Sequence, residues 1–297
     1  MAESTVAPEE LPPLASPAAS GGILEVFRRR YLLKLLVRRE ISARYQGSVL
    51  GLVWSYLNPL SQFFIYYVVF GIIMGRNQTE AYPIHLFTGL VIVHFFSETL
   101  TAGTRSIVRN RRIVEKMALP REMFPVASML VSAFHIGPQL VILVVACLFS
   151  GWRPDAAGMG AAVLGLLVCA SLGTSLALIF SAANVFLRDI GNGVNILTNF
   201  VRFGVPMMYP FENVMTGLRD HPKLIELYLA NPITEAVLLF QRGFWVGATH
   251  DPRATIASHM PDHLFLRGSI ALVASLAILL LAQTVFSRLE GKMPERL

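Results

Sequence analysis

Charged residues and cysteines are both scarce in this sequence. Asp, Glu, Lys and Arg together make up 15% of the 297 residues, against about 25% in an ordinary soluble domain. The two cysteines, Cys147 and Cys169, each lie within a long apolar run, where a cysteine behaves as a small hydrophobic side chain. Two such cysteines exclude a disulfide framework and a cysteine-ligated zinc site.

The motifs of nucleotide hydrolysis and of common hydrolases are also missing. The sequence contains neither a phosphate-binding GxxxxGK[ST] motif nor a GxSxG nucleophile turn. His259 and His263 have the i, i+4 spacing of a metal site, but Pro261 between them opposes a regular helix. We therefore expect no catalytic residue, no bound metal and no cofactor in this chain. If ATP drives the protein, a separate chain must hydrolyse it.

Long apolar runs are what the sequence does have. Hydrophobic residues make up 54% of the chain, and a bilayer core of about 30 Å requires about 20 apolar residues in a helix. The net charge of +6 is compatible with nucleic acid, but so apolar a chain favours a membrane and no nucleic acid. We predict an all-α integral membrane protein with six transmembrane helices, approximately at residues 52–74, 84–104, 126–149, 158–185, 194–209 and 268–286.

The first 46 residues divide into two segments. Residues 1–22 are rich in Pro, Ala, Ser and Glu and contain no apolar run, which predicts a disordered tail rather than a secretory signal. Residues 23–46 combine apolar side chains at helical spacing with several basic ones. They predict an amphipathic helix at the membrane surface, preceding a transmembrane domain of residues 47–297. The candidates for binding anionic lipid headgroups are Arg28, Arg29 and Arg30.

The distribution of Lys and Arg predicts how the chain lies in the membrane. The loop after the second predicted span carries six of them, whereas the loop after the first carries only Arg76. Because cytoplasmic loops are enriched in basic residues, we expect both termini in the cytoplasm and residues 210–267 outside.

A helical pattern occurs within this external connection, before the last span. Asn231-Pro232 is a typical helix start, and it precedes apolar side chains at helical spacing, Ile233, Val237, Phe240 and Phe244. We predict a helix that re-enters the outer face of the membrane, shielded there by neighbouring helices.

Residues 105–118 carry basic and apolar side chains on opposite faces of a predicted helix. The apolar face holds Ile107, Val114 and Ala118, so the helix would lie flat on the cytoplasmic surface. It is either a positively charged membrane anchor or a docking element for a cytoplasmic partner. Its basic face consists of Arg105, Arg109, Arg112 and Lys116.

An aromatic stripe on the first predicted span is a candidate substrate path. Its members are Tyr56, Phe63, Tyr67 and Phe70. They are either ordinary packing side chains or a surface along which a sugar chain slides, because the C–H faces of sugar rings lie well against aromatic rings. Movement along a path requires such weak contacts.

The fifth predicted span carries a polar stripe of Asn192, Asn195, Asn199 and Arg202. An arginine at the centre of a membrane helix costs about 2.5–3.5 kcal/mol, so Arg202 either faces a partner or cavity or extends to a nearby boundary. Glu98 in the second span is the candidate counter-ion. The candidate path residues on this span are Asn199, Arg202 and Phe203.

Short motifs in a fixed order resemble a known family over residues 31–288. These motifs are Gly51-Leu-Val-Trp54, Leu57-Asn-Pro59, Leu119-Pro-Arg121, Phe124-Pro125, Leu187-Arg-Asp189 and Asn231-Pro-Ile-Thr234. With the basic amphipathic start and the six spans, the chain resembles the ABC-2 type membrane subunits that export polysaccharides of the O-antigen, teichoic acid and mycobacterial galactan type.

The resemblance implies a homodimeric channel paired with two copies of a separate ATPase that binds ATP and magnesium. Such exporters move a polyprenyl-pyrophosphate-linked glycan across the bacterial inner membrane. It further implies that residues 105–121 dock on the ATPase, that Arg188 and Asp189 lie on the same side, and that the external connection forms gate helices at the exit. The anionic pyrophosphate would be recruited near the basic N-terminal helix.

Two other functions stay open at this point. A small-molecule or drug exporter of the same superfamily would share the topology but requires a closed apolar pocket. A membrane-embedded enzyme of lipid-linked sugar metabolism requires clustered acids or a nucleophile at a membrane face. The external acids show no such spacing; they are Glu212, Asp220, Glu226, Glu235, Asp251 and Asp262.

Overall fold

The computed structural model describes residues 21–48, 50–75, 79–117, 119–293 and 296. These residues contain helices and no strand, which confirms the all-α fold class. Of the predicted disordered tail at residues 1–22, only Gly21 and Gly22 are among the described residues. The N-terminal and short helices are α1 (Gly22–Arg28), α2 (Arg30–Tyr45), α5 (Arg111–Lys116), α9 (Phe211–Gly217), α10 (Pro222–Leu229) and α12 (Pro252–His259).

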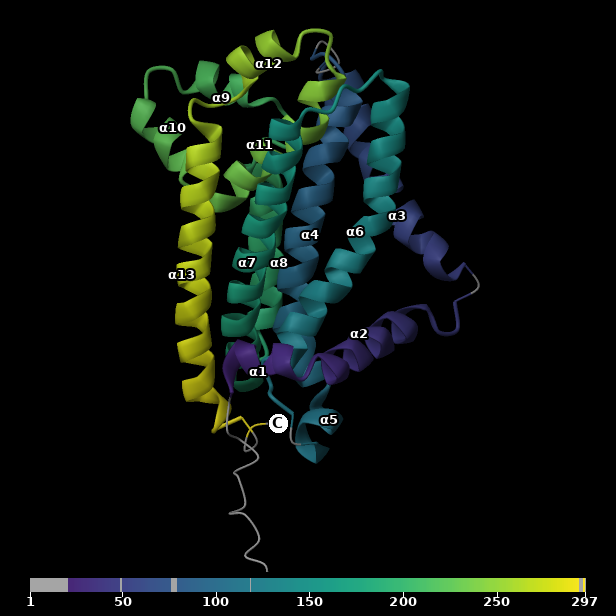
Figure 1. The fold of residues 1–297 in the computed structure, drawn as a ribbon, viewed down its shortest axis with the longest axis vertical. Coiled ribbons are helices and arrows are strands. Elements are labelled where there is room, and N and C mark those ends of the chain that lie inside the picture. Colours follow the sequence, from purple (N-terminus) through teal and green to yellow (C-terminus); the bar gives the residue numbers. More distant parts are fainter. Residues whose placement is uncertain (1–20, 49, 76–78, 118, 294–295, 297) are drawn as a thin grey trace, which may run out of the picture.

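Five helices are long and apolar enough to cross a membrane. They are α3 with its π-helical continuation (Trp54–Tyr66 and Tyr67–Ile73), α4 (Tyr82–Arg109), α6 (Met123–Phe149), α7 (Ala156–Phe186) and α13 (Leu264–Glu290). They correspond to the first four predicted spans and the last. The described part of the chain is thus a multi-pass bundle, drawn in Figure 1 with its long axis vertical.

The fifth predicted span, residues 194–209, corresponds to a short helix that begins and ends earlier in the sequence. Helix α8 (Ile190–Gly204) has 15 residues, which at 1.5 Å per residue is about 22 Å and less than a bilayer core. It ends because Val205, before Pro206, adopts the extended conformation that a following proline favours. The buried residues Val205 to Met208 then continue as irregular backbone.

The two ends of the bundle differ. Helices α1 and α2 cross one end of it, where α5 and the last turns of α13 also lie, and α9, α10 and α12 cover the opposite end (Figure 1). The predicted amphipathic helix of residues 23–46 is therefore two helices, separated at Arg29. They bury Val26, Leu33 and Leu36 and expose their basic side chains.

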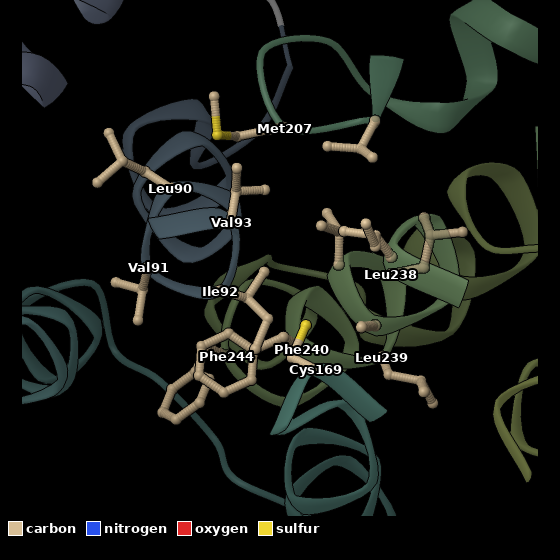
Figure 2. Close-up of a cluster of buried hydrophobic side chains, with 14 of the residues drawn as sticks. Leu90, Val91, Ile92, Val93, Cys169, Met207, Leu238, Leu239, Phe240 and Phe244 are labelled. Carbon is tan, nitrogen blue, oxygen red and sulfur yellow. The ribbon is translucent and has the colours of Figure 1, made fainter. Parts of the chain in front are cut away.

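Helix α11 (Pro232–Phe244) is the predicted helix of the external connection, and it penetrates the bundle. Asn231 caps its start, since the side-chain oxygen accepts from the Ile233 amide at 3.1 Å. Figure 2 shows Leu238, Leu239, Phe240 and Phe244 of α11 with the side chains of α4, around Cys169 of α7. Burial extends to nearly every residue of α11 rather than to one apolar stripe.

Small residues allow α7 and α11 to approach closely. A Cβ at Gly165 of α7 would lie 2.8 Å from the Ala236 carbonyl oxygen, and one at Gly243 of α11 would lie 2.8 Å from the Ala162 Cβ. Glycine permits such contacts between helices in a membrane, where close packing drives their association.

The predicted flat helix over residues 105–118 does not form as one helix. Arg105 and Arg109 belong to the end of α4, which stops before α5 begins at Arg111. The side chain of the buried Asn110 donates to Glu40 Oε1 at 3.0 Å and to the Ser106 carbonyl at 3.1 Å. The Asn110 side chain thus competes with the backbone hydrogen bonds of a continuous helix at the break between α4 and α5. The predicted apolar residue Ala118 lies outside the described residues.

Candidate functional site

A polar cavity of about 500 Å³ lies between α2, α3, α4, α6 and α8. Its volume is that of a small-molecule binding site, and polar or charged groups in a membrane-embedded bundle commonly mark a substrate path. We therefore treat it as the candidate functional site. Its polar lining comprises Arg44, Tyr45, Ser48, Ser55, Asn58, Ser61, Gln62, His94, Glu98, His135, Gln139 and Arg202.

Glu98 of α4 is the central charge of this cavity. Its side chain is 11% exposed, and its Oε1 atom lies 3.0 Å from His135 Nδ1 of α6. The same oxygen pairs with the guanidinium of Arg44, whose Nη1 lies 2.8 Å from His135 Nδ1. Because an unpaired carboxylate is costly inside a protein, this network holds the end of α2 against α4 and α6.

Arg202 of α8 lines the cavity without pairing with Glu98. Its Nη1 atom donates to the Tyr66 hydroxyl at 3.4 Å. Glu98, the candidate counter-ion of Arg202, pairs instead with Arg44, which is 54 residues away in sequence. Sequence spacing within the spans carried no information about where the end of α2 would fold.

A second cavity of about 400 Å³ shares Arg44 and Glu98 with the first. Its other charged lining residues are Arg39, Glu40 and Arg109, and Arg109 pairs with Glu40 at 2.5 Å. The second cavity thus extends to the end of α4 that adjoins α5. The Arg44–Glu98 pair is common to the walls of both.

Part of the predicted aromatic stripe packs inside the subunit. Phe63 lies 5.8 Å from Tyr67 and 5.4 Å from Phe87 of α4, and Tyr67 lies 6.4 Å from Tyr82 of α4, measured between ring centroids. In this conformation these rings join α3 to α4, and Phe63 and Tyr67 act as packing side chains.

The other aromatic residues of this helix are arranged differently. Phe70 lies 6.3 Å from Tyr66, and Tyr56 is half-buried. The most exposed rings of α3 are Phe64 and Trp54, which are 65% and 47% exposed, and Trp54 borders the polar cavity. On α8, the predicted path residues Asn199 and Phe203 are exposed, on the outer side of the subunit.

The predicted headgroup-binding residues lie on the junction of α1 and α2. Arg28, Arg29 and Arg30 are all exposed. Glu25 accepts from Arg29 Nε at 2.8 Å and lies 3.8 Å from the Arg28 guanidinium. Arg28 and Arg29 therefore share the Glu25 carboxylate, and the exposed Arg30 follows them at the start of α2.

The predicted docking residues separate into two groups. Arg105 donates to the Gly191 carbonyl at 3.3 Å and Arg109 pairs with Glu40, so both are engaged within the chain. The other four predicted docking residues are exposed, Arg112 and Lys116 in α5 and Arg188 and Asp189 in the turn between α7 and α8. These four side chains are the candidates for an open charged surface.

Sequence reasoning missed most of the cavity residues, among them His94, His135 and Gln139. His94 and Glu98 are spaced i, i+4 in one span, as are His135 and Gln139 in the next. Residues with this spacing share one helix face. A search for polar pairs at helical spacing within apolar spans would have found both halves of the site.

A multi-pass helical bundle with a polar cavity and an open charged end is the architecture of a membrane transport subunit. Comparison with protein families matches residues 31–245 to the ABC-2 type transporter model, and the chain belongs to this family. It is an ABC-2 type membrane permease, a transport subunit.

Similar proteins share one name, O-antigen export system permease protein RfbA. A protein of that name from Myxococcus xanthus is 27% identical over 225 residues, covering 75% of this chain and 84% of the relative. Two from Klebsiella pneumoniae are 26% and 27% identical over 251 residues, covering 83% of this chain and 90% of each relative.

Proposed function

We propose that this permease is the channel-forming subunit of an ATP-driven exporter of a polyprenyl-pyrophosphate-linked polysaccharide, of the galactan or O-antigen type. The polar cavity is the observation that carries the proposal. A drug exporter requires an enclosed apolar pocket, whereas this cavity is lined mainly by hydroxyl, amide, imidazole and charged groups. The names of the similar permeases support the same substrate class.

The proposed assembly is a homodimer with two copies of a separate ATPase. Apolar side chains on α8, including Phe200 at 73% and Phe203 at 57% exposure, contact no other element of the described chain extensively. A second copy facing α3 and α8 would cover them and place Asn199 and Phe203 beside the path. ATP and magnesium belong to the partner, because family members of this type work with an ATPase.

The proposed ATPase contact is the α5 end of the bundle. Arg112 and Lys116 on α5 lie exposed there, and Arg188 and Asp189 are exposed in the turn after α7. Closure of the ATPase against this surface would move α5. Because Asn110, between α4 and α5, donates a hydrogen bond to Glu40 of α2, the movement would also reach the ends of α4 and α2. We propose that this end of the bundle faces the cytoplasm, as do both termini, because cytoplasmic segments are enriched in basic side chains.

The proposed recruitment surface for the lipid-linked end is the junction of α1 and α2. Three exposed guanidinium groups, those of Arg28, Arg29 and Arg30, gather there. Basic side chains at an anionic membrane surface contribute about 1 kcal/mol each to attraction, and the pyrophosphate carries the complementary charge.

Depletion of this chain in its native cell tests the proposal. The lipid-linked glycans on each side of the inner membrane are then extracted and measured, with re-expression of the chain as the control. Full-length polyprenyl-linked polymer accumulating on the cytoplasmic side is the expected result. Normal export combined with new sensitivity to small toxic compounds would replace the proposal with drug export.

A further inference from the structure

The polar cavity contains buried acceptor atoms that its own residues do not satisfy. Gln139 is 1% exposed, and its Oε1 atom has no hydrogen-bond partner among the described residues. The same holds for Glu98 Oε2, which lies 3.8 Å from His94 Nε2. Buried polar atoms are normally paired, so two unpaired oxygens in one cavity point to a ligand.

The orientation of the Gln139 amide is fixed by its neighbours. Its Nε2 atom lies 3.4 Å from the His135 carbonyl oxygen, which can only accept a hydrogen bond. The amide nitrogen must therefore face that carbonyl, and it also lies 3.3 Å from His94 Nδ1. The amide oxygen of Gln139, a residue of the cavity lining, is left as a buried acceptor without a partner in the cavity wall.

The unpaired oxygens select the chemistry of the ligand. The Gln139 amide oxygen and the Glu98 carboxylate can accept hydrogen bonds but cannot donate them. An ionised phosphate or pyrophosphate also only accepts, so it could pair with the Arg44 or Arg202 guanidinium of the lining but could not satisfy these two oxygens. A sugar hydroxyl donates, and its own oxygen can accept from a guanidinium such as that of Arg202.

We infer that this cavity is a binding subsite for a sugar residue of the exported glycan, with Gln139 and Glu98 accepting from its hydroxyl groups. The inference rests on the proposed function, and it separates the sugar from the pyrophosphate, which is placed at the junction of α1 and α2. Trp54, half exposed at the cavity wall, offers an aromatic face to the ring. With few hydrogen bonds, the subsite holds successive residues weakly enough for them to move on.

Saturation-transfer NMR on the permease, purified with the ATPase that accompanies it, tests the inference. The probes are a galactan tetrasaccharide, a mannan tetrasaccharide and inorganic pyrophosphate. We expect binding of at least one tetrasaccharide, weakened about tenfold by Gln139→Met, which removes one buried acceptor. We expect pyrophosphate not to displace the sugar.

Two further variants provide a second test of the subsite and a matched control. Glu98→Gln retains the side-chain shape but places a donor at one carboxylate position, so it should weaken sugar binding as well. Thr88→Val is the matched control, because Thr88 is a buried polar residue of α4 whose hydroxyl bonds to the Ile84 carbonyl at 2.6 Å, outside the cavity. Thr88→Val should bind sugar as the unmodified chain does.

The results that would contradict the sugar subsite differ from those that would contradict the proposed function. The subsite is overturned if neither tetrasaccharide binds, if Gln139→Met binds sugar normally, or if pyrophosphate displaces the sugar. If Gln139→Met fails to copurify with the ATPase, Glu98→Gln decides the question by the same measurement. The proposed function instead fails if depletion of the chain causes no glycan to accumulate, whatever the NMR result.

Discussion

Arg242 of α11 and Asp155, the residue before α7, form a two-point ion pair in which Nη1 and Nη2 lie 2.9 Å and 2.6 Å from the two carboxylate oxygens. The Arg242 side chain is 12% exposed and that of Asp155 is 49% exposed. The pair fastens the penetrating helix α11 to the start of α7.

The first prediction concerns the dependence of this pair on pH. The hydrogen bond from Arg242 lowers the pKa of Asp155 below its usual value. Because the folded-state pKa is lowered, the stabilisation is complete above about pH 5 and disappears as the pH falls through the lowered pKa, below about pH 4. Asp155→Asn should lower the free energy of unfolding by up to about 1 kcal/mol at pH 7, a value suited to a half-exposed pair.

Thermal unfolding in detergent between pH 7 and pH 3 measures this effect. The difference between Asp155→Asn and the unmodified chain should vanish at the acid end. Asp220→Asn, an exposed acid at the same end of the bundle, should show no difference at any pH. A difference that persists unchanged at pH 3 would show that the carboxylate charge is not its source.

The second prediction tests the close approach of α7 and α11. Gly165→Ala places a Cβ 2.8 Å from the Ala236 carbonyl oxygen, so the helices must separate, at a cost of about 1–3 kcal/mol. Gly160→Ala is the matched control on the same helix, since nothing lies within 4 Å of its added Cβ. The melting temperature should fall for the first variant only. Equal melting temperatures for the two variants would mean that α7 and α11 can move apart at this crossing without loss of stability.

The third prediction concerns the coupling of Arg44 with Glu98. Arg44→Met leaves the largely buried carboxylate of Glu98 without its guanidinium partner and should destabilise the chain by about 1 kcal/mol, since Arg44 itself is half exposed. The same change made in a Glu98→Gln background should cost less. A double-mutant cycle of thermal unfolding measures the difference. Strictly additive effects would mean that the pair does not hold α2 in place.

The fourth prediction concerns the proposed ATPase contact. Arg112→Glu combined with Lys116→Glu reverses two exposed charges on α5 and should reduce the copurifying ATPase about tenfold or more. Arg219→Glu reverses an exposed charge at the opposite end of the bundle and should leave the copurified amount unchanged. Full recovery of the ATPase with the double variant would place the contact elsewhere.

The sequence was informative wherever a single segment determines the structure. Hydropathy located the five long helices, and Asn231-Pro232 predicted the start of α11, because length and capping are local properties. The sequence did not predict features that depend on packing between distant segments. The break at Asn110 depends on Glu40, which is 70 residues away, and the position of Arg44 beside Glu98 depends on how α2 folds back.

In the candidate site, too, the sequence predicted what one segment determines but not what depends on contacts between distant segments. Arg202 was identified because an arginine in an apolar helix is conspicuous in the sequence alone. The cavity itself combines residues of five helices, and its unpaired acceptors become visible only when the Gln139 amide is oriented by its neighbours. Helix rotation also decided that Phe63 and Tyr67 pack on α4, which periodicity within α3 could not specify.

The most direct test of the central claim is transport in proteoliposomes. The permease is purified with its accompanying ATPase and reconstituted, with lipid-linked glycan in the membrane and a glycosidase confined to the lumen of the vesicles. We predict that ATP added outside the vesicles makes the glycan susceptible to the luminal glycosidase. Vesicles that contain the permease alone should show neither this change nor ATP hydrolysis. Glycan that stays resistant when both chains and ATP are present, while hydrolysis proceeds, would contradict polysaccharide export by this chain.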